Sequence, residues 1–122
     1  MKIVSAANAM IATRDRITDV VPGACGGEVF FVYDKKHKWS ISKNNDAEFI
    51  LFFYPGNHNI RDLANWPEEA WYEFNEMIKY STKELGTKEA KETFAELYRI
   101  VKENLFGVGG VLDEIIGNAD WT

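Results

Sequence analysis

Residues 28–54 read EVFFVYDKKHKWSISKNNDAEFILFFY, a stretch in which three short apolar runs are separated by two polar turns. The middle run, residues 38–43, alternates polar and apolar side chains with a period of two, which is typical of a strand with one buried face. The flanking runs, residues 29–33 and 49–54, are apolar throughout and rich in β-branched and aromatic residues, which favours strands at this length. The stretch therefore predicts a three-stranded antiparallel meander. Residues 17–21 are also compatible with an extended conformation, which would make a fourth strand.

The lengths of the two turns determine which side chains share a face of this sheet. The turn candidates are residues 34–37 and 44–47, where Asn and Asp tolerate left-handed backbone conformations. With an even number of residues in each turn, Trp39 lies between Val32 and Phe52. The expected core face then carries Phe30, Val32, Trp39, Ile41, Ile50 and Phe52. The second face carries Val29, Phe31, Tyr33, Phe49, Leu51 and Phe53 around a central polar row of Lys38, Ser40 and Ser42, whereas an odd turn would reverse one strand.

Length and composition limit the class of protein. The 122 residues, 46% hydrophobic and 27% charged, predict one α+β domain over residues 1–122. A net charge of -5 argues against a nucleic acid or an anionic membrane as partner. Cys25 is the only cysteine, so an intrachain disulfide is excluded and a cytoplasmic location is expected. No apolar run approaches the roughly 18 residues of a membrane span.

Helices are expected on both sides of the meander in the sequence. Ile3, Ala7, Met10 and Ile11 have helical spacing, which predicts a short amphipathic helix over about residues 3–13, followed by a loop that reaches residue 27. After Pro55 and Gly56 the hydrophobic period changes from two to 3.6. We therefore expect helices in residues 60–116, packed against the sheet.

These later helices have recognisable start and stop signals. A short helix is expected over residues 60–64, and a long one over residues 67–85, from Pro67 to a stop at Gly86. Thr87 can cap a second long helix that ends at Gly107, and residues 111–116 predict a brief terminal helix, with Trp121 docking back onto the body.

No stretch of the chain carries a recognisable catalytic, cofactor or metal motif. Cys25 lies in a glycine-rich loop, where it is either a reactive thiol or, more simply, a small residue in a tight turn. His37 and His58 are not spaced as ligands of one metal ion. His58 belongs to a polar cluster just beyond a strand, a place where binding residues often collect, although helix capping by Asn57 or Asn59 accounts for most of that cluster.

Aromatic residues gather around the predicted helix start at Pro67. Trp71 and Phe74 fit the expected apolar stripe and are interpreted as core, whereas Trp66 and Tyr72 lie off it. Exposed Trp and Tyr side chains often dominate protein interfaces. Trp66 and Tyr72 are therefore candidate interface residues, as are Phe31 and Phe53 on the second sheet face.

The run GEVFFVYDKKHKWSI, together with FILFFYPG, resembles small bacterial proteins of unknown function that are carried on integron gene cassettes. The likeness covers about residues 3–64. It implies a compact cytosolic α+β protein that is often oligomeric, and it transfers no catalytic residue.

Two functional hypotheses are consistent with these observations. The first is a small soluble binding or protein-interaction module that associates with itself, as a homodimer, through the second sheet face or through Trp66 and Tyr72. The alternative is a small-molecule binding protein or enzyme whose cleft has a floor of Lys38, Ser40 and Ser42, with Tyr33 or His58 at its rim. An inhibitor of the immunity or antitoxin kind is compatible with the small size and acidity, but no residue pattern marks it.

Overall fold

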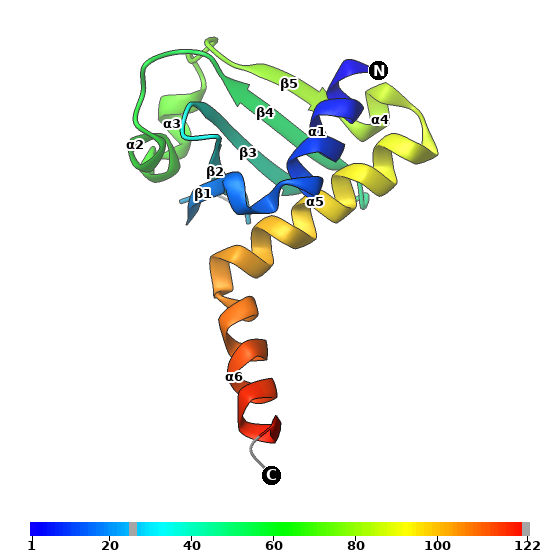
Figure 1. The fold of residues 1–122 in the computed structure, drawn as a ribbon. Helices are drawn as coiled ribbons and strands as arrows, with labels where there is room; N and C mark the ends of the chain where they lie inside the picture. The colour runs from blue at the N-terminus through cyan, green and yellow to red at the C-terminus, as the bar shows by residue number, and fades with distance from the viewer. Residues whose placement is uncertain (25–26, 121–122) are drawn as a thin grey trace.

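A five-stranded antiparallel sheet forms the centre of the protein, and its strands follow chain order (Figure 1). The computed structural model describes residues 1–24 and 27–120. The strands are β1 (Ile17–Pro22), β2 (Val29–Tyr33), β3 (His37–Lys43), β4 (Phe49–Tyr54) and β5 (Ile78–Ser81). The helices are α1 (Lys2–Ala12), α2 (Ile60–Asn65), α3 (Glu68–Trp71), α4 (Thr82–Leu85), α5 (Lys88–Phe106) and α6 (Val108–Asp120), and a 3-10 turn covers Arg14–Arg16. The α+β class and the antiparallel sheet are as expected, but the sheet has five strands rather than three or four.

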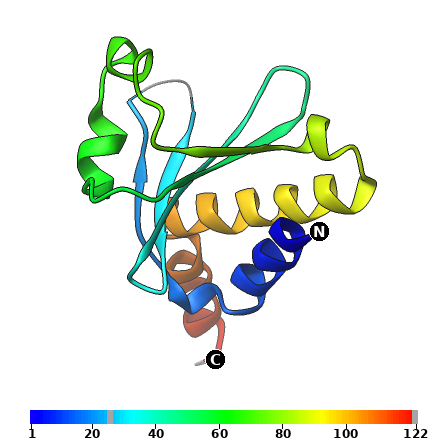
Figure 2. The ribbon, with the colours of Figure 1, turned by 90° about the horizontal axis from the view of Figure 1, so that it is seen from above.

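Helices cover both faces of the sheet. The long helix α5 and the N-terminal helix α1 lie on one face, and α2 with α3 lies at the other (Figure 2). The core under α5 includes Phe31, Ile41, Leu51, Phe94, Leu97 and Val101. The core under α2 includes Phe30, Val32, Tyr54, Ile60, Leu63 and Ala64. The central strands therefore bury side chains on both faces of the sheet.

Both hairpin turns are odd, so the expected register is wrong. Residues 34–36 and 44–48 form the turns, and Ser40 consequently lies opposite Phe30 and Phe52 instead of Phe31 and Leu51. Trp39 and Ile41 point towards α5, whereas Lys38, Ser40 and Ser42 point towards α2. Each odd turn reverses the strand that follows it, so two odd turns restore the expected orientation in β4. The β2 and β4 side chains therefore share faces as expected, and only β3 is reversed.

Local chemistry explains the odd turns. Asp34 and Lys35 both adopt left-handed conformations, with φ of 55° and 59°, and the Lys36 amide donates to the Tyr33 carbonyl at 3.2 Å. In the second turn, Asn44 Oδ1 accepts hydrogen bonds from the amides of Asp46 at 2.9 Å and Glu48 at 3.0 Å. One side chain therefore organises a five-residue loop.

The long helix expected over residues 67–85 does not form. Only the single turn α3 is helical at its start, and the strand β5 pairs with β4 before the short helix α4. Pairing satisfies the backbone donors and acceptors that β4 would otherwise present as an open edge, and this tertiary gain outweighs a helical spacing of apolar residues.

The other predicted elements are confirmed. Helix α1, strand β1 and helix α2 form where the sequence indicates, and α5 begins after Thr87, whose hydroxyl accepts a hydrogen bond from the Ala90 amide at 3.1 Å. Gly86 and Gly107 end their helices with left-handed φ values of 71° and 66°. The terminal helix α6 is longer than expected. Cys25 and Trp121 lie outside the described residues.

Candidate functional site

Helix α6 projects away from the sheet (Figure 1), and it carries an exposed apolar stripe. Val111, Leu112, Ile115 and Ile116 keep 51%, 52%, 60% and 57% of their surface exposed, and Phe106, just before the bend, keeps 67%. Their spacing places the four α6 side chains on one side of the helix. Apolar patches of this kind mark interaction sites more often than isolated exposed residues do.

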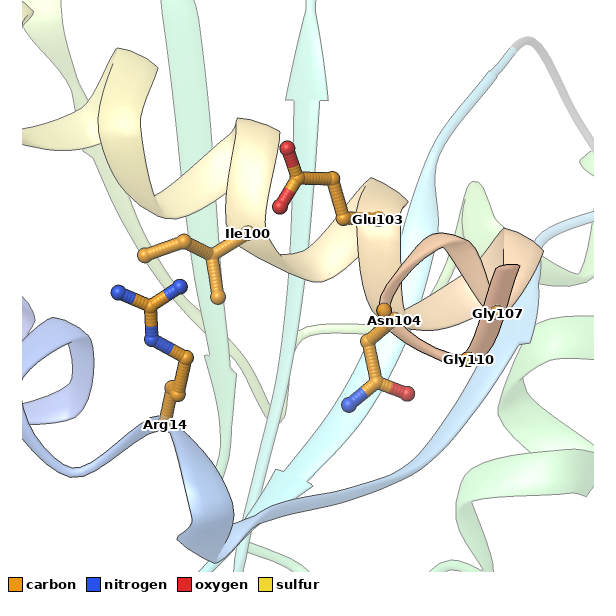
Figure 3. Close-up of a pocket in the computed structure, with 7 residues that line it drawn as sticks. Arg14, Ile100, Glu103, Asn104, Gly107 and Gly110 are labelled. Carbon is orange, nitrogen blue, oxygen red and sulfur yellow. The ribbon is translucent and has the colours of Figure 1, made fainter. Parts of the chain in front are cut away.

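The bend at Gly107 separates α6 from the body. A left-handed residue at this position ends α5 and redirects the chain, so α6 contacts little apart from α5. On the inner side of the bend, a pocket of about 330 Å³ lies between Arg14, Ile100, Glu103 and Asn104 (Figure 3). Gly109 and Gly110 of α6 line the same pocket, so their side of the helix faces Arg14. The apolar stripe lies on the opposite side of α6 and therefore points away from this pocket.

A second hollow, which we call the apolar groove, lies on the other side of α5. It has a volume of about 400 Å³ and is lined by Glu28, Val29, Tyr98, Lys102, Leu105 and Phe106 together with residues at the end of β1 and the start of β2. Lys102 Nζ lies 5.1 Å from the centre of the Tyr98 ring, which places a positive charge at the groove. The groove and the α6 stripe meet at Phe106.

The predicted polar row lies together on β3, on the α2 side. Ser40 is fully buried rather than at the floor of an open cleft, and Lys38 Nζ donates a hydrogen bond to the Gly56 carbonyl at 2.5 Å. Ser42 is half-buried. Tyr33 lies on the opposite face, where its hydroxyl is 2.6 Å from the Thr13 hydroxyl. Tyr33 therefore does not join Lys38, Ser40 and Ser42.

Ser40 is the centre of a hydrogen-bonded chain of three side chains. Its hydroxyl donates to Glu28 Oε2 at 2.5 Å and lies 2.7 Å from the Tyr54 hydroxyl, which can donate to it. Burial raises the pKa of Glu28, although the Ser40 hydrogen bond acts in the opposite direction. Burial and the nearby Glu28 carboxylate raise the pKa of Tyr54. Because Ser40 has no solvent exposure, it is not placed to attack a substrate.

The remaining predicted site residues are spread over both faces. His58 packs edge-on against Trp66 and Phe74, with ring centres 5.3 Å and 5.4 Å apart. Trp66 is half-buried in this aromatic cluster, whereas Tyr72 keeps 75% of its surface exposed. Asn59, one of the two expected capping residues, caps α2 through the Arg61 amide at 2.8 Å.

The two sheet residues suggested as interface residues lie under α5 or at its margin. Phe31 is fully buried in the core and so lies inside the molecule rather than on a surface. Phe53 is half-buried, with its ring 4.8 Å from that of Trp39.

Sequence reasoning missed Glu28 and the α6 stripe. Glu28 directly precedes an apolar strand and lies two and four positions before Phe30 and Val32. Side chains at this spacing share one face of a strand, so the spacing indicates that Glu28 points to the same side of the sheet as Phe30 and Val32. The α6 stripe was visible as apolar residues at 108, 111, 112, 115 and 116, but the sequence pattern alone does not say whether such a stripe finds a partner within the chain.

Within residues 1–24 and 27–120, no helix is both long and apolar enough to cross a bilayer. Over the same residues, no three His, Cys, Asp or Glu side chains come close enough to hold a metal ion.

Comparison of the chain with models of protein families, with curated proteins and with solved structures finds no match. Any assignment of function therefore depends on the geometry of the chain itself.

Proposed function

We propose that this protein is a self-associating interaction module, in which α6 of one copy packs into the apolar groove of a second copy. The observation that carries the proposal is the exposed stripe of α6, whose four aliphatic side chains are each more than half exposed. A C2 dimer that exchanges α6 would cover both stripes and both grooves in one closed assembly.

A second copy suits the groove because one chain carries both halves of the contact, the α6 stripe and the groove. The bend at Gly107 directs α6 away from the body, so the helix does not reach its own groove without refolding that bend. The groove offers Leu105 and Phe106 to aliphatic side chains, with the buried Val29 at its base. Its charged lining residues are Lys102 and Glu28, and Lys102 is the one that can meet α6, whose described charged side chains, Asp113 and Glu114, are acidic.

The expected size of the contact predicts a moderate affinity. Thirteen residues make a helix about 20 Å long and about 10 Å across, so two exchanged helices and two grooves contribute about 800 Å² in projection. Specific interfaces begin at about 1,000 Å² of buried surface. We therefore expect a monomer–dimer equilibrium with a Kd in the micromolar range.

Sedimentation equilibrium over a concentration series tests the proposal. Ile115→Asp places a charge in the middle of the stripe, and Gly117→Asp places the same charge on the opposite side of the helix, where a new Cβ would meet no atom within 4 Å. Each copy loses burial of an isoleucine that is 60% exposed in the monomer, worth about 1 kcal/mol per copy, so the dimer should weaken by roughly 30-fold or more.

The control and the stripe variant must behave differently. Gly117→Asp should keep the dimer, and neither change should alter the unfolding of the monomer, because both positions are exposed there. A protein that stays monomeric at all concentrations, or two variants that dimerise equally well, would refute the proposal.

A further inference from the structure

A small aromatic cavity lies on the α2 side of the sheet, the face opposite α5. Its volume is about 160 Å³, and it is lined by Glu28, Phe52, Tyr54, Glu68, Trp71 and Met77. Tyr54 is buried, while Phe52, Trp71 and Met77 are half-buried and Glu68 is exposed. The cavity is therefore closed at the sheet and reaches water at the Glu68 side.

The walls of the cavity are electron-rich. The Tyr54 and Trp71 ring centres are 6.0 Å apart with 49° between their planes, and the Phe52 and Tyr54 centres are 6.4 Å apart. Phe30 stacks behind both Tyr54, at 5.7 Å, and Trp71, at 6.1 Å, which fixes the orientation of these rings. Aromatic faces carry the negative part of the ring quadrupole and attract cations.

The charges at the cavity have one sign. Two carboxylates, Glu28 and Glu68, line it, and neither Lys nor Arg is among its lining residues. The partner of Glu28 in the hydrogen-bonded chain is the Ser40 hydroxyl, a neutral group, at 2.5 Å. Glu28 is half-buried, and among the described residues its printed hydrogen-bond partner is neutral, so a bound cation would stabilise this carboxylate.

From the combination of aromatic walls, unbalanced carboxylates and a volume of about 160 Å³, we propose that this cavity binds a small organic ammonium ion, of the methylated or quaternary class. A quaternary ammonium head brings its charge without hydrogen-bond donors that the rings would leave unsatisfied, and it suits a site with aromatic side chains in its walls. A divalent metal ion suits the site less well, because it requires about six oxygen ligands and the cavity offers two carboxylates.

Glu28 lines both the apolar groove and this cavity, whereas Trp71 lines the cavity and not the groove. Ile115→Asp would change the α6 stripe and leave the cavity lining as it is, and Trp71→Leu would leave the groove lining as it is, so ligand binding and self-association can fail separately.

Choline and its uncharged carbon analogue, 3,3-dimethylbutan-1-ol, form the matched pair of probes. The two have nearly the same shape and differ in the charge of the central atom. Titration followed by ¹H–¹⁵N correlation spectra and by calorimetry should show saturable binding of choline, with shifts at Glu28, Tyr54 and Trp71. Choline should bind at least tenfold more tightly than the alcohol.

Two variants locate the binding. Glu28→Gln keeps the size of the side chain and its ability to accept the Ser40 hydrogen bond, and it should weaken choline binding about tenfold or more. Trp71→Leu removes a ring wall, and it should weaken binding about tenfold. Glu69→Gln, also on α3 but outside the cavity lining, is the control and should bind choline as the unchanged protein does.

The outcomes separate clearly. Equal binding of choline and the alcohol would mean a merely apolar cavity and would overturn the proposal. Absence of saturable choline binding, or binding that Glu28→Gln and Trp71→Leu both leave unchanged, would overturn it too.

Discussion

Removing the hydroxyl of Ser40 should destabilise the fold far more than the size of the change suggests. In Ser40→Ala, the Glu28 carboxylate loses the donor at 2.5 Å and the Tyr54 hydroxyl loses its partner at 2.7 Å. A hydrogen bond to a charged group contributes about 1.5–3 kcal/mol and a neutral one about 1 kcal/mol, so the free energy of unfolding should fall by about 3 kcal/mol. For a chain of this size, that corresponds to a Tm lower by roughly 10 °C.

The loss should also depend on pH. The Ser40 hydrogen bond favours the charged form of Glu28, so its removal raises the pKa of Glu28 further. Above that pKa the variant keeps a half-buried carboxylate that has lost its Ser40 donor. In acid the carboxyl group is protonated in both proteins, and the difference between them should become smaller.

Urea denaturation at neutral and at acid pH measures both effects. Ser42→Ala, two positions away on the same face of β3 but half-buried, is the matched control and should change the free energy of unfolding by no more than about 0.5 kcal/mol. The reasoning fails if Ser40→Ala and Ser42→Ala are equally stable, or if the loss in Ser40→Ala is the same at both pH values.

Three further outcomes are expected. Glu28→Gln should be more stable than the unchanged protein at neutral pH. The raised pKa of Glu28 makes the folded state bind more protons than the unfolded state, so the stability of the unchanged protein falls as the pH rises from the unfolded pKa to the folded pKa. Urea denaturation at several pH values tests this, and a difference between the two proteins that is as large in acid as at neutral pH would contradict it. Thr87→Ala should cost about 1 kcal/mol by removing the cap of α5, measured by thermal unfolding, and an unchanged Tm would exclude that role. Lys35→Gly should stabilise the protein by about 0.5–1 kcal/mol, because Lys35 has a φ of 59°, which glycine adopts without strain. Lys36→Gly, at a residue outside the left-handed region, should not stabilise it. Equal effects of the two changes in denaturant unfolding would contradict this.

Much of the architecture could be predicted because it depends on local signals. The alternation around Trp39, the helical spacing in α1 and α5, the Thr87 cap and the Gly107 stop each lie within a few residues of the element that they define. The strand β5 has no such local signal. It forms because β4 offers a free edge, and that edge exists only once the meander has folded.

The candidate sites were harder to predict because they depend on register. A change of one residue in a turn reverses every side chain of a strand, and Asp34 and Lys35 adopt left-handed conformations that their residue types do not require. Ser40 was recognised as one of the central polar residues, but its pairing with Glu28 and Tyr54 needed the correct register.

The chain's local chemistry was thus sufficient for an α+β protein with an antiparallel meander, an N-terminal helix and a capped long helix. Only the meeting of distant segments decided which face Ser40 occupies, how Glu28 comes to lie half-buried beside aromatic rings, and how far the α6 stripe is exposed. The physical reason is that secondary structure depends on neighbours in sequence, whereas burial and charge environment depend on neighbours in space.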